Sequence, residues 1–244
     1  MKVYGLIGYP LSHSFSKGFF AEKFQREGIQ QCVYENFPIP TIADFPGLLQ
    51  AQPQLSGLNV TIPYKEAILP FLDELSPAAA KIKAVNCIRF HDGRKTGYNT
   101  DVIGFKKSLL PFLQPHHTRA LVLGTGGAAK AVMYVLEELG IAYTLVSRTA
   151  ADGVVTYASL DAAMMAAHTL IVNTSPLGMY PDVDKAPPLP YECLSSQHLL
   201  YDLIYNPEKT LFLQKGAARG AAVKNGHEML ILQAEASWDI WNDQ

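Results

Sequence analysis

Two short stretches in the first half of the chain carry side chains that could transfer a proton. The stretch 59–65 follows an apolar run and ends in Lys65, and the stretch 97–101 ends in Asp101 at the start of a helical pattern. Oxidation of a secondary alcohol needs a group that removes the hydroxyl proton as hydride leaves, and a lysine oriented by a carboxylate can do this. Taken singly, Lys65 is more typical of a surface lysine and Asp101 is more typical of a helix cap.

A glycine cluster in the second half of the chain predicts a different kind of site. Residues 124–129 read Gly-Thr-Gly-Gly-Ala-Ala between a buried-strand run, 119–123, and an alanine-rich helical stretch. Glycines at these positions permit a tight turn and let the backbone approach a pyrophosphate at a helix N-terminus. A glycine fingerprint alone is weak, but its position between a strand and a helix favours a dinucleotide site.

The end of the next strand bears on which dinucleotide binds. NAD sites usually place an acid there to hold the ribose 2′-hydroxyl, whereas this chain has Ser147, Arg148 and Thr149. An arginine can stack on adenine and pair with a 2′-phosphate, which favours NADP. Asp152 would repel that phosphate, so the use of NAD stays open.

The elements that must position these residues alternate between strands and helices. The predicted strands cover residues 3–8, 32–37, 58–62, 84–90, 95–98, 119–123, 143–146, 169–172 and 199–203. The predicted helices follow Ser14, cover 41–52, begin near Lys65, cover 100–113, follow the glycines to Leu139, and cover about 160–167 and 228–241. This order favours parallel sheets with right-handed crossovers.

The sequence therefore predicts an α/β protein of two domains. The first is an N-terminal α/β substrate-binding and catalytic domain with a mixed, mainly parallel sheet, residues 1–114, completed by 227–244. The second is a C-terminal Rossmann domain that binds the dinucleotide, residues 115–226, and the last helix returns to the first domain. Hydride transfer needs the substrate carbon and the nicotinamide in contact, so we expect both domains to contribute to catalysis.

Composition limits the possible partners. Lys and Arg number 20 against 22 Asp and Glu, which gives a net charge of −2 and no basic surplus for nucleic acid. No apolar run approaches the ~18 residues of a membrane helix, so no membrane partner is expected. The cysteines lie far apart without metal-ligand spacing, and we expect no metal. We expect a cytoplasmic enzyme that is a monomer or a homodimer.

Taken together, the motifs of this chain resemble those of the shikimate dehydrogenase family, which includes shikimate/quinate dehydrogenases, over nearly the whole length. The matching segments, in family order, are 8–16, 59–65, 84–86, 99–101, 124–128, 148–149, 173–179, 202–205 and 225–234. Each is ordinary alone, but their common order is specific. The resemblance implies the reversible NADPH-dependent reduction of 3-dehydroshikimate to shikimate, in chorismate and aromatic amino acid biosynthesis.

The resemblance also implies a role for each matched residue. Lys65 and Asp101 would transfer the proton. The residues that would bind the substrate carboxylate or hydroxyls are Ser14, Ser16, Asn59, Thr61, Asn86, Tyr205 and Gln233. The residues that would bind NADP are Gly124, Gly126, Gly127, Ala128, Ser147, Arg148, Thr149, Asn173, Thr174, Leu203 and Gly226.

Several positions depart from the family pattern and leave alternatives open. Lys83 stands where the family usually has Gly, Cys87 where it has Thr, Ser147 where it has Asn, Asp152 where it often has Arg, and Leu211 where it usually has Pro. The alternatives are an NAD-using quinate/shikimate dehydrogenase, a relative with a folate-type substrate, and a non-catalytic dinucleotide-binding regulator. The presence of both Lys65 and Asp101 counts against the regulator.

Overall fold

The computed structural model describes residues 1–11 and 14–243, and over these the chain divides into two compact units. One unit is Met1–Thr100 with Ala234–Gln244, and the other is Asp101–Gln233. The division falls inside two helices, α4 (Thr100–Leu109) and α8 (His227–Asn242). The domain limits expected from the sequence, after residue 114 and before 227, stay a prediction.

The first unit is built on a mixed sheet in the order β2-β1-β3-β5-β6-β4. Its strands are β1 (Lys2–Gly8), β2 (Cys32–Pro38), β3 (Leu55–Val60), β4 (Glu74–Leu75), β5 (Cys87–His91) and β6 (Arg94–Tyr98). Strand β1 pairs in parallel with β2 and β3, and β5 runs antiparallel to β3 and β6. Because β1 is central and covered on both faces, its residues after Lys2 are all buried.

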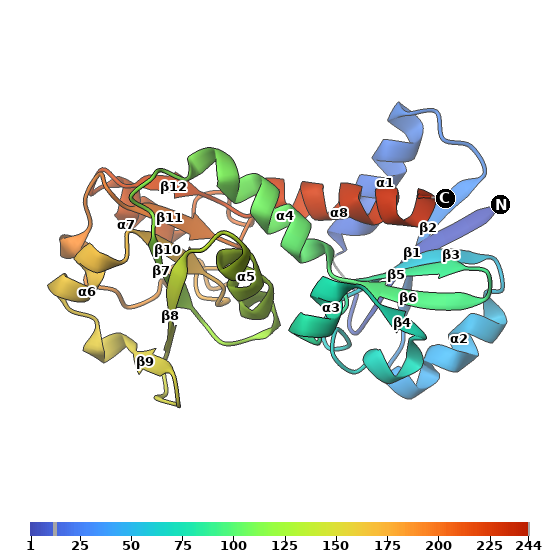
Figure 1. Cartoon of the computed structure of the whole chain (residues 1–244). Helices are drawn as coiled ribbons and strands as arrows, with labels where there is room; N and C mark the ends of the chain where they lie inside the picture. Colours follow the sequence, from blue (N-terminus) through green and yellow to red (C-terminus); the bar gives the residue numbers. More distant parts are fainter. Residues whose placement is uncertain (12–13, 244) are drawn as a thin grey trace. The chain divides into compact units, whose positions relative to one another are not determined.

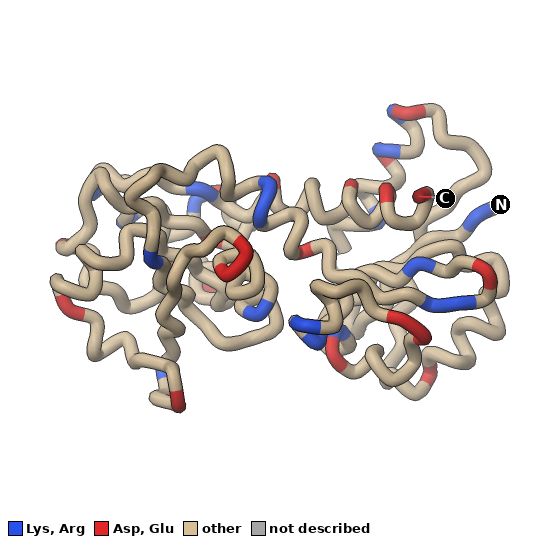
Figure 2. Tube along the Cα trace, in the orientation of Figure 1, with Lys and Arg blue, Asp and Glu red and all other residues tan. Residues whose placement is uncertain are grey.

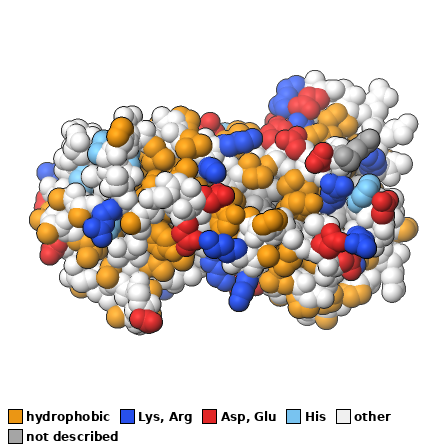
Figure 3. Space-filling view, in the orientation of Figure 1, with side chains coloured by type: hydrophobic (Ala, Val, Ile, Leu, Met, Phe, Trp, Pro, Cys, Tyr) orange, Lys and Arg blue, Asp and Glu red, His pale blue; other side chains and the backbone are white. Residues whose placement is uncertain are grey.

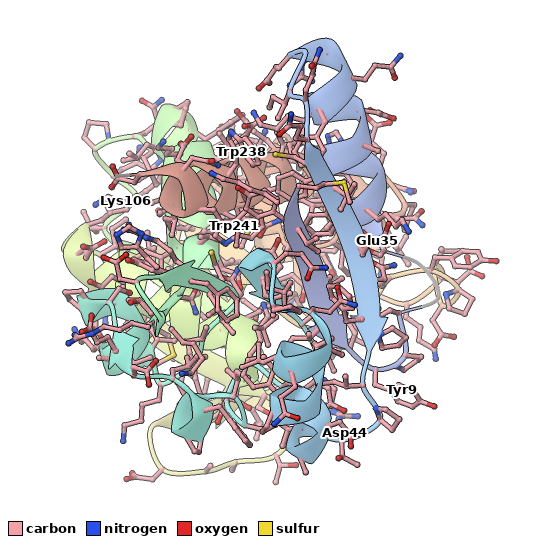
Figure 4. All side chains as sticks on the ribbon, turned by 90° about the vertical axis from the view of Figure 1, so that its right-hand side faces the viewer. Tyr9, Glu35, Asp44, Lys106, Trp238 and Trp241 are labelled. Atoms are coloured by element: carbon pink, nitrogen blue, oxygen red, sulfur yellow. The ribbon has the colours of Figure 1, made fainter. Side chains whose placement is uncertain are left out.

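Helices pack on this sheet, and the end of the last helix is among them. They are α1 (Phe15–Arg26), α2 (Phe45–Ala51), α3 (Pro77–Ile82) and the last turns of α8. The Trp241 ring stacks on Tyr4 at 4.9 Å, and its indole N–H donates to the Ile88 carbonyl at 3.0 Å. Figure 4 shows Trp238 and Trp241 projecting from α8 beside the strands. The predicted return of the last helix to the first sheet is confirmed.

The helix expected to start near Lys65 does not form. The segment makes turns and a short 3-10 helix, Leu69–Phe71. Pro70 has no backbone N–H to donate and disfavours helical geometry at the residue before it, which explains the interruption. A helix that the sequence pattern did not predict, α3, begins instead at Pro77, where Ser76 accepts a hydrogen bond from the Ala79 N–H at 3.3 Å.

The second unit is a doubly wound parallel sheet in the order β12-β11-β10-β7-β8-β9. Its strands are β7 (Arg119–Leu123), β8 (Ala142–Ser147), β9 (Val154–Thr156), β10 (Leu170–Asn173), β11 (Leu199–Asp202) and β12 (Ala222–Lys224). Helix α5 (Gly127–Glu138) lies on one side, and α6 (Ala162–Ala167) and α7 (Leu211–Ala217) lie on the other (Figure 1). The Rossmann prediction is confirmed, although β9, β12 and α7 were not predicted. The strand order reverses between β7 and β10, the usual place for a dinucleotide.

Charged residues are distributed through both units without a large segregation of sign. Figure 2 shows Lys and Arg interspersed with Asp and Glu along the chain trace, and Figure 3 shows both signs on one face among hydrophobic side chains. Over residues 1–11 and 14–243, no helix is long and apolar enough to cross a bilayer.

Candidate active site

The N-terminus of α1 presents two serines. Ser14 caps the helix and accepts a hydrogen bond from the Lys17 N–H at 3.4 Å, and Ser16 lies in the first turn, hydrogen-bonded to the Tyr34 phenol. Both serines are half-buried. The unpaired N–H groups and partial positive charge of a helix N-terminus favour an anion, so this helix end fits the predicted carboxylate site.

The segment after β3 carries Thr61 and Lys65, and hydrogen bonds to other segments hold its backbone in place. The Thr61 N–H donates to the Ile7 carbonyl at 2.9 Å. The buried Tyr64 hydroxyl donates to the Ile39 carbonyl at 2.6 Å, and the Lys65 carbonyl accepts from the Val85 N–H at 2.8 Å. Lys65 is half-buried at the end of this segment, with its backbone carbonyl held by Val85.

Asn59, near the end of β3, belongs to a buried hydrogen-bond network. Its amide oxygen accepts from the Tyr34 hydroxyl at 2.9 Å. Its amide nitrogen donates to the Asn86 carbonyl at 3.2 Å and to the Ser237 hydroxyl at 2.9 Å. Both amide hydrogens are therefore in use, and Asn59 is only 6% exposed. Asn59 therefore has no N–H left to donate to a substrate, and a substrate hydroxyl would have to donate to the second lone pair of its amide oxygen.

Tyr34, Cys87 and Ser237 complete this network, and sequence analysis gave them no role in the site. Burial raises the pKa of Tyr34 well above its ordinary value, despite the hydrogen bond from Ser16. Burial likewise raises the pKa of Cys87 to about 12, against the opposing effect of hydrogen bonds with Ser237 and Trp241, so the thiol stays protonated. A signal was available, because Ser237 is a polar residue on the apolar face of the last helix.

Asn86 determines where α4 begins. Its side-chain oxygen accepts from the Thr100 N–H at 2.6 Å and from the Thr100 hydroxyl at 3.1 Å. Thr100 is the first residue of the helix, and Asn86 supplies the acceptor for its N–H. Asp101 follows in the first turn, where an acid is stabilised by the helix dipole.

The glycine turn after β7 has the shape of a phosphate cradle. Gly124 has φ +119°, and a Cβ there would lie 2.7 Å from the Thr174 hydroxyl, which bonds the Leu123 carbonyl at 2.9 Å. Cβ atoms at Gly126 and Gly127 would meet no described atom within 4 Å, and both glycines are exposed. Helix α5 begins at Gly127 without a side-chain cap. Backbone amides open to solvent at a helix N-terminus fit a pyrophosphate.

The end of β8 carries the residues predicted to select the cofactor. Ser147 is half-buried and pairs in register with Thr156 of β9, whereas Arg148, Thr149 and Asp152 are exposed. Burial raises the pKa of Tyr157, and the positive charge of Arg148 partly opposes that rise. Only residues 148–153 connect these parallel strands, without the helix that usually makes such a crossover. Arg148 and Asp152 therefore share one short connection.

Asn173 is wholly buried, and its side chain organises the loop after β10. Its amide nitrogen donates to Asp202 at 3.0 Å, and its oxygen accepts from the Ser175 N–H at 3.1 Å and hydroxyl at 2.6 Å. Asn173 thus holds in place the loop that carries Thr174, whose side chain is half-buried. Asp202 was in a matched motif but had been given no role, although an acid ending an apolar strand is an available signal.

The remaining predicted residues lie on the loops after β11 and β12 and on α8. A Cβ at Gly226 would collide with the Leu203 carbonyl, so only glycine permits this close packing of the two loops. Tyr205 is 41% exposed. Gln233 is half-buried, and its side-chain nitrogen donates to the Leu230 carbonyl at 2.9 Å.

Comparison with known proteins identifies the family. A family described as "Shikimate dehydrogenase substrate binding domain" matches residues 6–88. The shikimate dehydrogenase (NADP(+)) of Desulforamulus reducens is 35% identical, with 98% of this chain and 89% of that protein covered. The structure of shikimate 5-dehydrogenase from Thermus thermophilus in complex with NADP(H) and shikimate has a TM-score of 0.87 at 32% identity, covering 100% of this chain and 94% of that one. The shikimate 5-dehydrogenase from Listeria monocytogenes in complex with shikimate and NAD has a TM-score of 0.91 at 25% identity, covering 100% and 92%. The chain therefore belongs to the shikimate dehydrogenase family.

Proposed function

We propose that this chain is an oxidoreductase that reduces 3-dehydroshikimate to shikimate reversibly with NADPH, as part of aromatic amino acid biosynthesis. The observation that carries the proposal is the internal support of its two candidate catalytic residues. The backbone of Lys65 is held by Val85, and the helix that carries Asp101 is held at its start by Asn86. Such preorganisation is what a proton-transfer group requires.

In this proposal each half of the chain has a distinct task. The N-terminus of α1, with Ser14 and Ser16, binds the substrate carboxylate, together with Tyr205. Thr61, Asn86 and Gln233 orient the ring hydroxyls. Lys65 donates the proton to the carbonyl oxygen during reduction and removes it from the hydroxyl during oxidation, and Asp101 orients the ammonium group.

The cofactor residues of the proposal belong to the second unit. The turn at Gly124, Gly126 and Gly127 binds the pyrophosphate through backbone amides, and Ala128 continues the helix N-terminus. Arg148, with Ser147 and Thr149, binds the 2′-phosphate. Thr174, Leu203 and Gly226 form the wall for the nicotinamide. When bound, NADPH supplies the hydride and NADP⁺ accepts it in the reverse reaction.

Asp152 favours one alternative, an enzyme that uses NAD and also accepts quinate. It is exposed in the same short connection as Arg148, where a carboxylate opposes the binding of a phosphate. We also propose a cytoplasmic location, which suits an enzyme acting on a small soluble acid.

The decisive assay is a comparison of substrates and cofactors. The purified protein is mixed with shikimate or quinate, each with NADP⁺ or NAD⁺, and the absorbance of the reduced nicotinamide is followed. We expect the highest kcat/KM for shikimate with NADP⁺. A preference for NAD⁺ would favour the alternative, and no reduction in any of the four mixtures would overturn the proposed function.

A further inference from the structure

Asp202 is a fully buried carboxylate at the end of β11, and its oxygens are met by donors from three segments. One oxygen accepts from the Asn173 amide nitrogen at 3.0 Å and from the Ile204 N–H at 3.1 Å. The other accepts from the Thr210 hydroxyl at 2.6 Å. A charge-assisted acceptor that serves three donors is a strong geometric constraint.

The three donors belong to segments that leave the carboxyl end of the sheet. Asn173 ends β10 and holds the loop that carries Thr174, through two hydrogen bonds from Ser175. Ile204 lies in the loop after β11, beside Leu203. Thr210 caps α7 by accepting from the Leu213 N–H at 3.4 Å. One carboxylate therefore fixes two neighbouring loops and a helix start relative to one another.

The loop after β11 is fixed from its other side as well. The Leu203 N–H donates to the Asn173 carbonyl at 3.0 Å, and the Gly226 N–H donates to the Ile204 carbonyl at 3.0 Å. The backbones of Gly226 and Leu203 are so close that no side chain would fit between them. A displacement at Asp202 would therefore pass to the loops after β10 and β12.

We propose that Asp202 is a positioning residue for the dinucleotide, which sets the distance between the loop carrying Thr174 and the loop carrying Leu203. The inference rests on the proposed function, in which these two loops contact the cofactor. Asp202 itself touches neither substrate nor cofactor in this assignment, and it acts through Asn173 and Ile204.

If Asp202 served stability alone, a neutral residue would avoid the free-energy cost of burying a charge. Burial raises the pKa of Asp202 to about 6, although the bonds from Thr210, Ile204 and Asn173 oppose the rise. The ionised side chain is thus held in an environment that disfavours its charge. Residues that conflict with local stability are concentrated at functional sites.

The substitution that separates position from stability is Asp202→Asn. It retains the size and the acceptor for Asn173 and Ile204, but it places an amide nitrogen where Thr210 needs an acceptor. Ser108→Ala is the matched control, because it removes a buried 2.6 Å bond to Tyr201, the neighbour of Asp202, and the other hydrogen bonds of Ser108 go to its own helix, at Gly104 and Phe105. For both variants and the unaltered protein we would measure the NADP⁺ dissociation constant by calorimetry, kcat and KM with shikimate, and the thermal midpoint.

For Asp202→Asn we expect NADP⁺ binding about fivefold to tenfold weaker and kcat about tenfold lower, the effect of a small misplacement, with an unchanged or higher thermal midpoint. Ser108→Ala should lower the midpoint and leave binding and kcat unchanged. Wild-type binding and kcat in Asp202→Asn would overturn the proposal, as would losses that match a reduced folded fraction. If the unaltered protein binds NADP⁺ but does not oxidise shikimate, the proposed function fails, and the dissociation constants still decide the role of Asp202. An unaltered protein that binds no NADP⁺ would overturn both.

Discussion

The Asn86 side-chain oxygen accepts both the backbone N–H and the hydroxyl of Thr100, at 2.6 and 3.1 Å. The pair is buried and joins the residue before β5 to the first residue of α4. Asp101, whose carboxylate is proposed for catalysis, directly follows Thr100. The Asn86 side chain therefore fixes the backbone position from which the Asp101 side chain projects. The chemistry thus depends on a contact made far from it in sequence.

Thr100→Val should weaken this support. The valine keeps the shape and the backbone bond but leaves the Asn86 oxygen without one donor and removes the hydroxyl that lies 3.3 Å from Ser237. We expect the free energy of unfolding to fall by about 0.5–1.5 kcal/mol, the usual contribution of one buried hydrogen bond, and kcat to fall. Urea unfolding and steady-state kinetics check both effects. Thr100→Ser should behave like the unaltered protein, and equal stability of the valine variant would contradict the assignment.

Lys83→Gly should stabilise the chain. Lys83 has φ 57° at the C-terminal cap of α3, a left-handed conformation that costs a side-chain-bearing residue about 1–2 kcal/mol. We expect a gain of about 1 kcal/mol in the free energy of unfolding, measured in urea, since glycine also loses more backbone freedom on folding. Lys83→Ala retains the strain and should give no such gain. A glycine variant no more stable than the alanine variant would argue against strain at this cap.

Arg148 and Asp152 should act in opposite directions on cofactor choice. Arg148→Ala should weaken NADP⁺ binding by about 1.5–3 kcal/mol, the scale of a hydrogen bond to a charged group, and should affect NAD⁺ less. Asp152→Arg should tighten NADP⁺. Dissociation constants for both cofactors check this. An equal loss for NADP⁺ and NAD⁺ would mean that Arg148 only stacks on adenine.

The pKa of Asp202 gives a signed dependence of stability on pH. Its folded pKa, about 6, exceeds the ordinary 3.8, so the native state binds more protons than the unfolded state between these values. The contribution of this group to the unfolding free energy therefore falls by about 3 kcal/mol as pH rises from about 4 to 6. Its titratable neighbour Tyr191 has a pKa raised by burial and stays neutral there, with Lys215 4.7 Å from its ring.

The measurement is the difference in unfolding free energy between the unaltered protein and Asp202→Asn, taken across this pH window. As pH rises, the asparagine variant should become more stable relative to the unaltered protein, because only the unaltered protein must ionise a buried carboxylate. A difference that stays constant from pH 4 to 7 would contradict the raised pKa.

Local patterns in the sequence sufficed for much of the fold. Ser14 as a helix cap, the glycine turn at residues 124–127 and the buried runs of β1 and β7 all depend on neighbours along the chain, and each forms as expected. The return of the last helix followed from motif order, and it is confirmed by Trp241 on Tyr4.

The hydrogen-bond partners that the sequence did not reveal at the site are residues far apart in sequence. The side chain of Asn59 is hydrogen-bonded to Tyr34 and Ser237, and that of Asn173 is hydrogen-bonded to Asp202. Periodicity does not reveal such partners. The missing helix near Lys65 is different, because Pro70 was a local signal that outweighed the helical pattern.

In the proposed reaction Lys65 transfers the proton, with Asp101 as its partner. The direct test is the kcat of Lys65→Ala for shikimate oxidation with saturating NADP⁺, with Asp101→Asn measured beside it and folding checked by circular dichroism. We predict that kcat falls by roughly 10²–10⁴-fold in each variant, the usual effect of losing a positioned acid–base group, while NADP⁺ binding is retained. Turnover close to that of the unaltered protein in both variants would contradict the claim.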